Sequence, residues 1–124
     1  MPTEITNPLV PDSNANPLPG AEHEVVRELS SRFGTEACRF QRTRDGVPTL
    51  WVPRAKIQEV LHFLKQLPKP FSMFYDLSAI DEQLRNYRRG QPHAEFTVFY
   101  HLLSLERTTF TYSGDVRIKV ALEA

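Results

Sequence analysis

Two aromatic-rich runs in the second half of the chain constrain its fold more than any other feature. They are FSMFYDL at residues 71–77 and FTVFYHLLSL at residues 96–105. Aromatic and β-branched side chains favour strands, and runs as apolar as these predict strands buried in a sheet. The segment between them, residues 81–91, is too polar for a core and predicts an exposed connection. The runs therefore indicate a sheet and its packing, and they do not by themselves indicate a reaction.

Two helices are predicted from apolar residues that recur at three- and four-residue steps. Residues 21–33 carry such a stripe and end before Gly34, which favours a helix stop. Residues 53–67 begin at a proline, which suits a first helical turn, and they end before Pro68. Each segment thus predicts an amphipathic helix with one face available for packing.

Three further strands are predicted outside the aromatic runs. The dipeptide Asp45-Gly46 is typical of a hairpin turn and separates two strand-like segments, residues 37–43 and 47–52. Pro48 cannot donate to a ladder, so the second of these strands lies at a sheet edge or starts beyond the proline. Residues 116–122 place Val116, Ile118, Val120 and Leu122 on one face and Arg117 and Lys119 on the other, the pattern of a half-buried antiparallel strand.

The length of 124 residues fits one domain. Residues 1–20 are rich in proline and have little to bury, so they predict a flexible tail. Residues 21–124 then form a single α+β domain, with two helices packed on a five-stranded, mostly antiparallel or mixed sheet. Its fourth strand is expected over residues 95–107, and residues 108–114 carry β-prone side chains that predict ordered structure.

Charge and composition exclude several classes of partner. Lys plus Arg and Asp plus Glu number 15 each, so no strong field attracts nucleic acid or anionic lipid. No run approaches the roughly 18 to 20 apolar residues of a membrane span, and the first twenty residues lack a secretory pattern. The single cysteine, Cys38, cannot form an internal disulfide and is expected to be a small hydrophobe in a strand.

Residues that could carry catalysis do not form a convincing set. Asp76 and Asp81 flank the end of the third predicted strand, where one of them with a histidine could perform acid–base chemistry if burial raised a pKa; a solvated strand end is favoured. No two of the four histidines have metal-ligand spacing. No glycine motif for phosphate binding occurs. We therefore assign no catalytic, cofactor-binding or metal residues. The histidines are His23, His62, His93 and His101.

A small basic and aromatic patch lies in the charged connection. It consists of Arg85, Tyr87, Arg88 and Arg89. These residue types could stack on bases and contact phosphate, but acidic neighbours and the neutral whole chain argue against nucleic acid. Because Arg and Tyr are favoured at protein interfaces, the patch is a candidate surface for a partner protein, with plain solvation as the alternative.

Three segments of the chain resemble a known family. They are RDGVPTLWV at residues 44–52, the stretch from residue 67 to residue 85 that contains LPKPFSMFYDL, and EFTVFYHLLSLER at residues 95–107. In this order they are similar to the N-terminal part of the 30-kilodalton-type C subunit of respiratory NADH–quinone oxidoreductase (complex I). The closest likeness is to bacterial versions in which the C and D subunits are fused in one polypeptide.

The resemblance implies a structural, cofactor-free domain in the peripheral arm, on the cytoplasmic side of the bacterial inner membrane. Flavin, iron–sulfur clusters and quinone would belong to the full complex and none to this chain. The implied role is to brace the quinone-site and iron–sulfur subunits, with the quinone-site D subunit as the chief partner. No activity is then expected from the chain alone.

Two departures from the family pattern keep a second function open. The family's downstream signature is absent, which predicts a fragment of a longer family protein. Residues 108–113 are longer and more β-prone than the family's usual turn, and an extended insert of this kind can pair with a sheet edge, including that of another copy. The alternative function is therefore a stand-alone protein-binding or self-associating module with no redox role.

Overall fold

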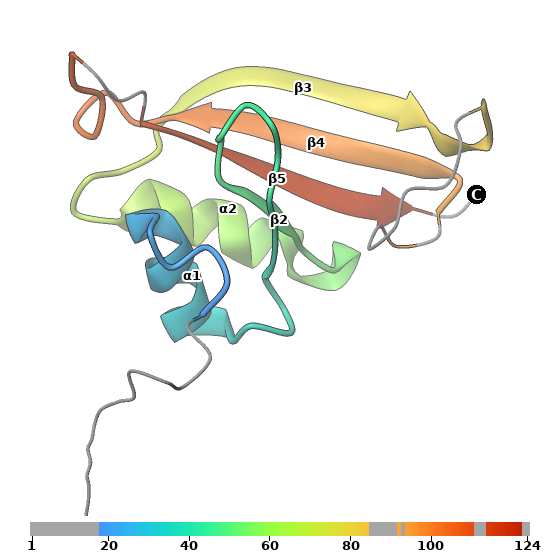
Figure 1. Ribbon diagram of the computed structural model, residues 1–124, viewed down its shortest axis with the longest axis horizontal. Helices are drawn as coiled ribbons and strands as arrows, with labels where there is room; N and C mark the ends of the chain where they lie inside the picture. Colours follow the sequence, from blue (N-terminus) through green and yellow to red (C-terminus); the bar gives the residue numbers. More distant parts are fainter. Residues whose placement is uncertain (1–17, 85–91, 93, 111–113, 123–124) are drawn as a thin grey trace, which may run out of the picture.

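The computed structural model describes residues 18–84, 92, 94–110 and 114–122 of the chain. It contains helix α1 (Glu24–Phe33), strands β1 (Arg39–Gln41) and β2 (Thr49–Trp51), the short helix η1 (Arg54–Lys56), helix α2 (Ile57–Gln66), strand β3 (Met73–Asp81), the short helix η2 (Glu82–Leu84), and strands β4 (Phe96–Leu103) and β5 (Asp115–Leu122). The five strands form one sheet, and both α-helices lie on the same side of it (Figure 1). The predicted α+β class, with two helices and five strands, is confirmed.

The sheet has the strand order β1-β2-β5-β4-β3 and is mixed. Strands β2 and β5 are parallel, and the other three neighbouring pairs are antiparallel. Strand β5, which comes last in the sequence, thus lies in the middle, between β2 and β4. Strand β2 is interior as well, and it begins only after Pro48, so the missing N–H of the proline costs the strand no ladder bond.

The core fills the space between the helices and strands β2, β5 and β4 of the sheet. Strand β5 turns Val116, Ile118 and Val120 inward, as its alternation predicts. Buried residues of α1, α2, β2 and β4 complete one continuous apolar cluster. Figure 1 shows β3 at the opposite edge of the sheet, farthest from both helices. The helices therefore cover β1, β2 and β5 better than they cover the β3 edge.

Most element ends follow the local signals in the sequence. Gly34 caps α1 with a positive φ of 89°, and its N–H donates to the Ser30 carbonyl. Gly46 has a φ of 76° in the turn between β1 and β2, where the Asp-Gly pair predicts a hairpin. The strands β1 and β2 are shorter than expected, with three residues each. Strand β3 runs on to Asp81, four residues beyond its predicted end.

One expectation about the aromatic runs is wrong. Residues 71–77 were expected to be buried in the sheet, yet only Phe71 is, and Met73, Phe74, Tyr75 and Leu77 are exposed. Phe71 precedes β3 and points into the core, whereas the rest of the run belongs to the outermost strand. Strand β4 also ends earlier than predicted, at Leu103, because a turn begins at Leu105.

Residues 108–114 carry β-prone side chains that predict ordered structure, but the part that the structure describes, residues 108–110 and 114, forms no strand. Residues 108–110 are outside any strand and exposed, and residues 111–113 lie outside the described part. The hydroxyl of Thr108 donates to the Ser104 carbonyl and accepts the N–H of Gly114. The Thr108 side chain thus links the residue that follows β4 to the residue that precedes β5.

Cys38 is buried just before β1, and burial raises the pKa of its thiol to about 11. We expect the native protein to react with a disulfide reagent at about pH 8 far more slowly than the unfolded protein, because the thiolate is the reactive form. The rate of thiol modification with and without denaturant measures this difference. Equal rates would mean that the thiol is accessible in the folded state.

Candidate functional site

Strand β3 presents an exposed apolar surface at the edge of the sheet. The exposed fractions of Phe74, Tyr75 and Leu77 are 54%, 68% and 56%. Met73 and, on the neighbouring strand, Phe96 are exposed as well. We call these five residues the β3 surface. An exposed group of large apolar side chains on a small domain typically marks a contact with another protein.

The backbone of β3 adds a second reason to regard this edge as a binding surface. Strand β3 pairs with β4 on one side and, among the described residues, with nothing on the other. Natural edge strands are usually short or carry lysine or proline, which prevents pairing with other chains. The opposite edge, β1, has three residues and starts with Arg39, whereas β3 has nine residues with neither Lys, Arg nor Pro. Only the β3 edge lacks these protections.

The register of the sheet shows which face each exposed residue occupies. Phe74 pairs with Leu102 and Leu77 pairs with Tyr100, and both partners face the helices. Phe74 and Leu77 therefore continue the core face past the reach of the helices. A register irregularity between Phe74 and Asp76 turns Tyr75 to the other face, where its ring meets that of His101 at 5.1 Å between centroids.

The second feature of the site is the buried side chain of Arg107, which lies in the turn that follows β4. Its Nη1 and Nη2 atoms donate to Glu28 Oε1 and Oε2 at 2.7 and 3.2 Å, and Nη1 also donates to Glu24 Oε1 at 3.1 Å. Its Nε donates to the Lys69 carbonyl at 2.9 Å. The guanidinium lies 4.6 Å from the ring centroid of Phe71. One side chain thus joins α1, the segment before β3 and the turn after β4.

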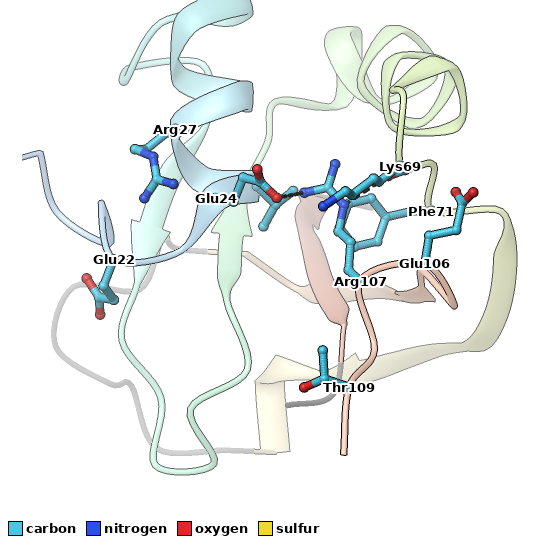
Figure 2. A pocket seen from close by; sticks show the side chains of 9 residues that line it. Glu22, Glu24, Arg27, Lys69, Phe71, Glu106, Arg107 and Thr109 are labelled. Atoms are coloured by element: carbon cyan, nitrogen blue, oxygen red, sulfur yellow. Dashed lines mark hydrogen bonds and ion pairs between the residues drawn. The ribbon is translucent and has the colours of Figure 1, made fainter. Parts of the chain in front are cut away.

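A cavity of about 270 Å³ opens beside this arginine. Figure 2 shows Glu24, Lys69 and Phe71 gathered around Arg107, while Glu22 and Thr109 lie farther away along the rim. Four of the five guanidinium N–H groups already have an acceptor within the chain. Two glutamates neutralise the charge of Arg107. The arrangement is therefore typical of an arginine that stabilises the fold and not of an anion-binding site.

On the sheet face away from the helices, polar side chains pair with one another near the β1–β2 hairpin. Asp45 Oδ2 accepts from Arg117 Nη2 at 2.8 Å, and Asp45 Oδ1 accepts from the Thr43 hydroxyl at 2.6 Å. The hydrogen bond from Arg117, with a smaller contribution from Thr43, holds the pKa of the Asp45 carboxyl well below its usual range. The pair fastens the tip of the β1–β2 hairpin to the central strand β5.

Because the folded-state pKa of Asp45 is lowered, its contribution to stability is present above the unfolded pKa of about 3.9 and is lost as the pH falls below it. We expect Asp45→Asn to show a smaller loss of unfolding free energy than the wild type between about pH 6 and pH 3. Urea unfolding at both pH values measures it. Glu36→Gln, which removes an exposed carboxyl elsewhere, serves as the control and should behave like the wild type.

The residues considered for acid–base chemistry do not converge on a reactive arrangement. Asp76 lies in register with His101, but His101 Nε2 is bonded to Asp115 Oδ2 at 2.9 Å. Asp81 lies at the end of β3 and accepts the N–H of Gln83. Both carboxylates are exposed, as expected, but Asp76 lies inside β3 rather than at its end.

Other sequence-based assignments have different outcomes. Arg85, Tyr87, Arg88 and Arg89 lie outside the described residues, so the predicted basic patch stays a prediction. Within the described part of the chain, no group of three or more His, Cys, Asp or Glu side chains could hold a metal ion. In the same part, no helix has both the length and the apolar character needed to cross a membrane.

Sequence reasoning missed both main features of the site. The burial of Arg107 depends on glutamates 79 and 83 residues away in the chain. The one local signal was the four-residue spacing of Glu24 and Glu28, which places two carboxylates on one helix face. The exposure of β3 had one signal too, namely that its polar residues, Asp76, Ser78 and Asp81, interrupt the apolar pattern.

Comparison with known proteins shows which family the chain resembles. The family model described as respiratory-chain NADH dehydrogenase, 30 Kd subunit, matches residues 50–124. The C/D subunits of NADH-quinone oxidoreductase from Pseudomonas paraeruginosa PA7 and from Pseudomonas aeruginosa strain UCBPP-PA14 are each 55% identical over 106 residues. The match covers 86% of this chain and 17% of each relative, so the chain spans about a sixth of their length.

A solved structure shares the fold. It is described as Nqo5 of a trypsin-resistant fragment (1-134), and it superposes with a TM-score of 0.56 at 17% identity, covering 80% of this chain and 70% of that one. The match of the family model to more than half of the chain decides the assignment, in agreement with the resemblance of its three segments. The chain belongs to the family of the 30 Kd subunit of respiratory-chain NADH dehydrogenase.

Proposed function

We propose that this chain is a structural, cofactor-free domain in the peripheral arm of a proton-translocating NADH–quinone oxidoreductase. Its role is to brace the quinone-site and iron–sulfur subunits, on the cytoplasmic side of the bacterial inner membrane. The observation that carries the proposal is the exposed β3 surface on a member of this family. A long edge strand that is left uncovered can bind an extended segment of a neighbouring subunit.

The chief partner in this proposal is the quinone-site D subunit. The relatives of the chain are named as C/D subunits, so the two parts occur in one polypeptide there. The proposed absence of a cofactor is supported by the contacts that three ionisable side chains make within the domain. Arg107, His101 and Asp45 are each held by another side chain of the domain itself.

A chimera tests the structural role. We expect the C/D polypeptide of Pseudomonas aeruginosa to assemble with the other subunits when its matched 106-residue segment is replaced by that of this chain. The yield of assembled enzyme and its NADH–quinone activity measure the result, and a chimera lacking the segment is the control. Assembly that is equal with and without the segment would show that it braces nothing.

The purified chain alone tests the cofactor assignment. We expect no flavin absorbance, no iron by elemental analysis and no NADH oxidation, because no three His, Cys, Asp or Glu side chains in the described part of the chain could hold a metal ion and Arg107, His101 and Asp45 are held by other side chains. Stoichiometric flavin or iron in the purified chain would contradict the proposal. A stand-alone binding module is the second candidate, favoured by the same exposed edge strand; it predicts that the chimera fails to assemble.

A further inference from the structure

We infer that β3 is completed in the assembled enzyme by an extended segment of another part of the assembly, which adds to it as a sixth strand and carries a lysine or arginine opposite Asp76. This inference rests on the proposed function and names the surface and the chemistry of the contact. It concerns the outer edge of β3, the β3 surface beside it, and one carboxylate.

The backbone of β3 fixes the form of the partner. A strand of nine residues exposes a row of outward N–H and C=O groups that, within the described part of the chain, meet no second strand. An extended segment satisfies these groups by continuing the ladder, whereas a helix laid on the edge would leave them unpaired. The partner segment is therefore a strand.

The side chains of β3 fix the apolar part of the partner. Phe74 and Leu77 project from the face that carries the helices, and Tyr75 projects from the other face. An added strand places its alternate side chains beside both groups, since successive residues of a strand point to opposite faces. Apolar residues on the added strand would remove Phe74 and Leu77 from water, which is the main gain in free energy.

The charged residues of β3 indicate which polar side chain the partner segment carries. Strand β3 contains Asp76 and Asp81 and no cationic residue. Asp81 accepts a backbone N–H, whereas the Asp76 carboxylate has no hydrogen bond or ion pair with any described residue. Covering an unpaired carboxylate costs free energy unless a donor or a cation meets it. A lysine or arginine on the added strand supplies that contact.

The same charges argue against a second copy of this chain as the occupant. Pairing β3 with the β3 of another copy would bring four aspartates to one seam without a cation on either strand. Like charges that face each other across strands are destabilising. A basic segment of a different sequence has the complementary charge.

Amide hydrogen exchange in the assembled chimera described above tests the added strand. We expect outward-facing β3 amides to exchange about a hundredfold more slowly in the complex than in the isolated chain, while the amides that already bond to β4 change little. Unchanged exchange across β3 in an assembled complex overturns the inference. Protection that appears in the isolated chain as its concentration rises, together with a dimer by light scattering, would assign the edge to a second copy and also overturn it.

Matched substitutions test the surface and the charge. Leu77→Lys should lower the yield of assembled enzyme about tenfold, while Leu105→Lys, at an equally exposed leucine off the sheet, should leave it unchanged. Asp76→Lys should lower the yield several-fold and Asp76→Asn much less, since only the former repels the cation. Equal yields for the two leucine variants overturn the docking at β3, and equal yields for the two Asp76 variants overturn the basic partner.

These outcomes separate the inference from the proposed function. If the unsubstituted chimera does not assemble, the structural role in this enzyme fails. If it assembles while β3 stays unprotected and the substitutions are silent, the role stands and only the assignment of the edge is wrong.

Discussion

Replacing Phe71 by alanine will lower the free energy of unfolding by about 3–5 kcal/mol, the usual cost of removing a buried aromatic ring. The ring is 2% exposed, belongs to the core cluster and lies against the guanidinium of Arg107. Its loss leaves a cavity in the core and removes the ring that the guanidinium of Arg107 contacts. Urea unfolding of the purified chain measures the effect.

The matched variant is Phe74→Ala, three residues along the same run. Phe74 is more than half exposed and touches the ring of Tyr100 at 6.2 Å between centroids. Its truncation should cost less than about 1 kcal/mol in the isolated chain, since little apolar area leaves water there on folding. If both variants lost equal stability, Phe74 would have to be packed like Phe71, and the description of β3 as an exposed strand would be wrong.

Replacing Arg107 by alanine will destabilise the domain by roughly 2 kcal/mol, the usual size for hydrogen bonds to charged groups and less than for a fully buried ion pair, because Glu28 and Glu24 keep 25% and 54% of their side chains exposed. The arginine side chain is 6% exposed, and its removal leaves Glu28 and the Lys69 carbonyl without their donor. Arg107→Lys should recover only part of the loss, because an ammonium group cannot reproduce the two parallel bonds to Glu28. Denaturant unfolding of both variants gives the comparison.

The surface pair of Arg42 and Glu22 provides the control for that prediction. Its two atoms are as close, at 2.8 Å, but both side chains are largely exposed. Exposed pairs contribute little because water screens them and two long side chains must be ordered. Arg42→Ala should therefore leave the stability unchanged within error. A loss as large as that of Arg107→Ala would mean that burial does not distinguish the two arginines.

The sequence predicted the helices, the hairpin and the central strand correctly because their signals are local. The four-residue recurrence of Val25 and Leu29 and the alternation in residues 116–122 report which side of each element faces the core. The family resemblance was also correct, and it came from ordered segments rather than from any catalytic residue. These parts of the fold depend on neighbours in the chain.

The parts that failed depend on distant contacts. The apolar run at residues 71–77 is compatible with either a central or an edge strand, and nothing within it shows how far α1 and α2 extend beneath the sheet. The burial of Arg107 requires α1 and the β4 turn to meet. The predicted patch of Arg85, Tyr87, Arg88 and Arg89 is untested and remains a prediction.

The place of β5 in the sheet has a consequence for how the domain is made. Among the described strands, the antiparallel pairs β1–β2 and β3–β4 are joined within the sheet only by β5, which follows both in the chain. During translation the sheet is therefore divided into these two pairs until residues 115–122 leave the ribosome. The five-stranded sheet can therefore form only after β5 has been synthesised, because β5 supplies the contacts between strands that are distant in the chain.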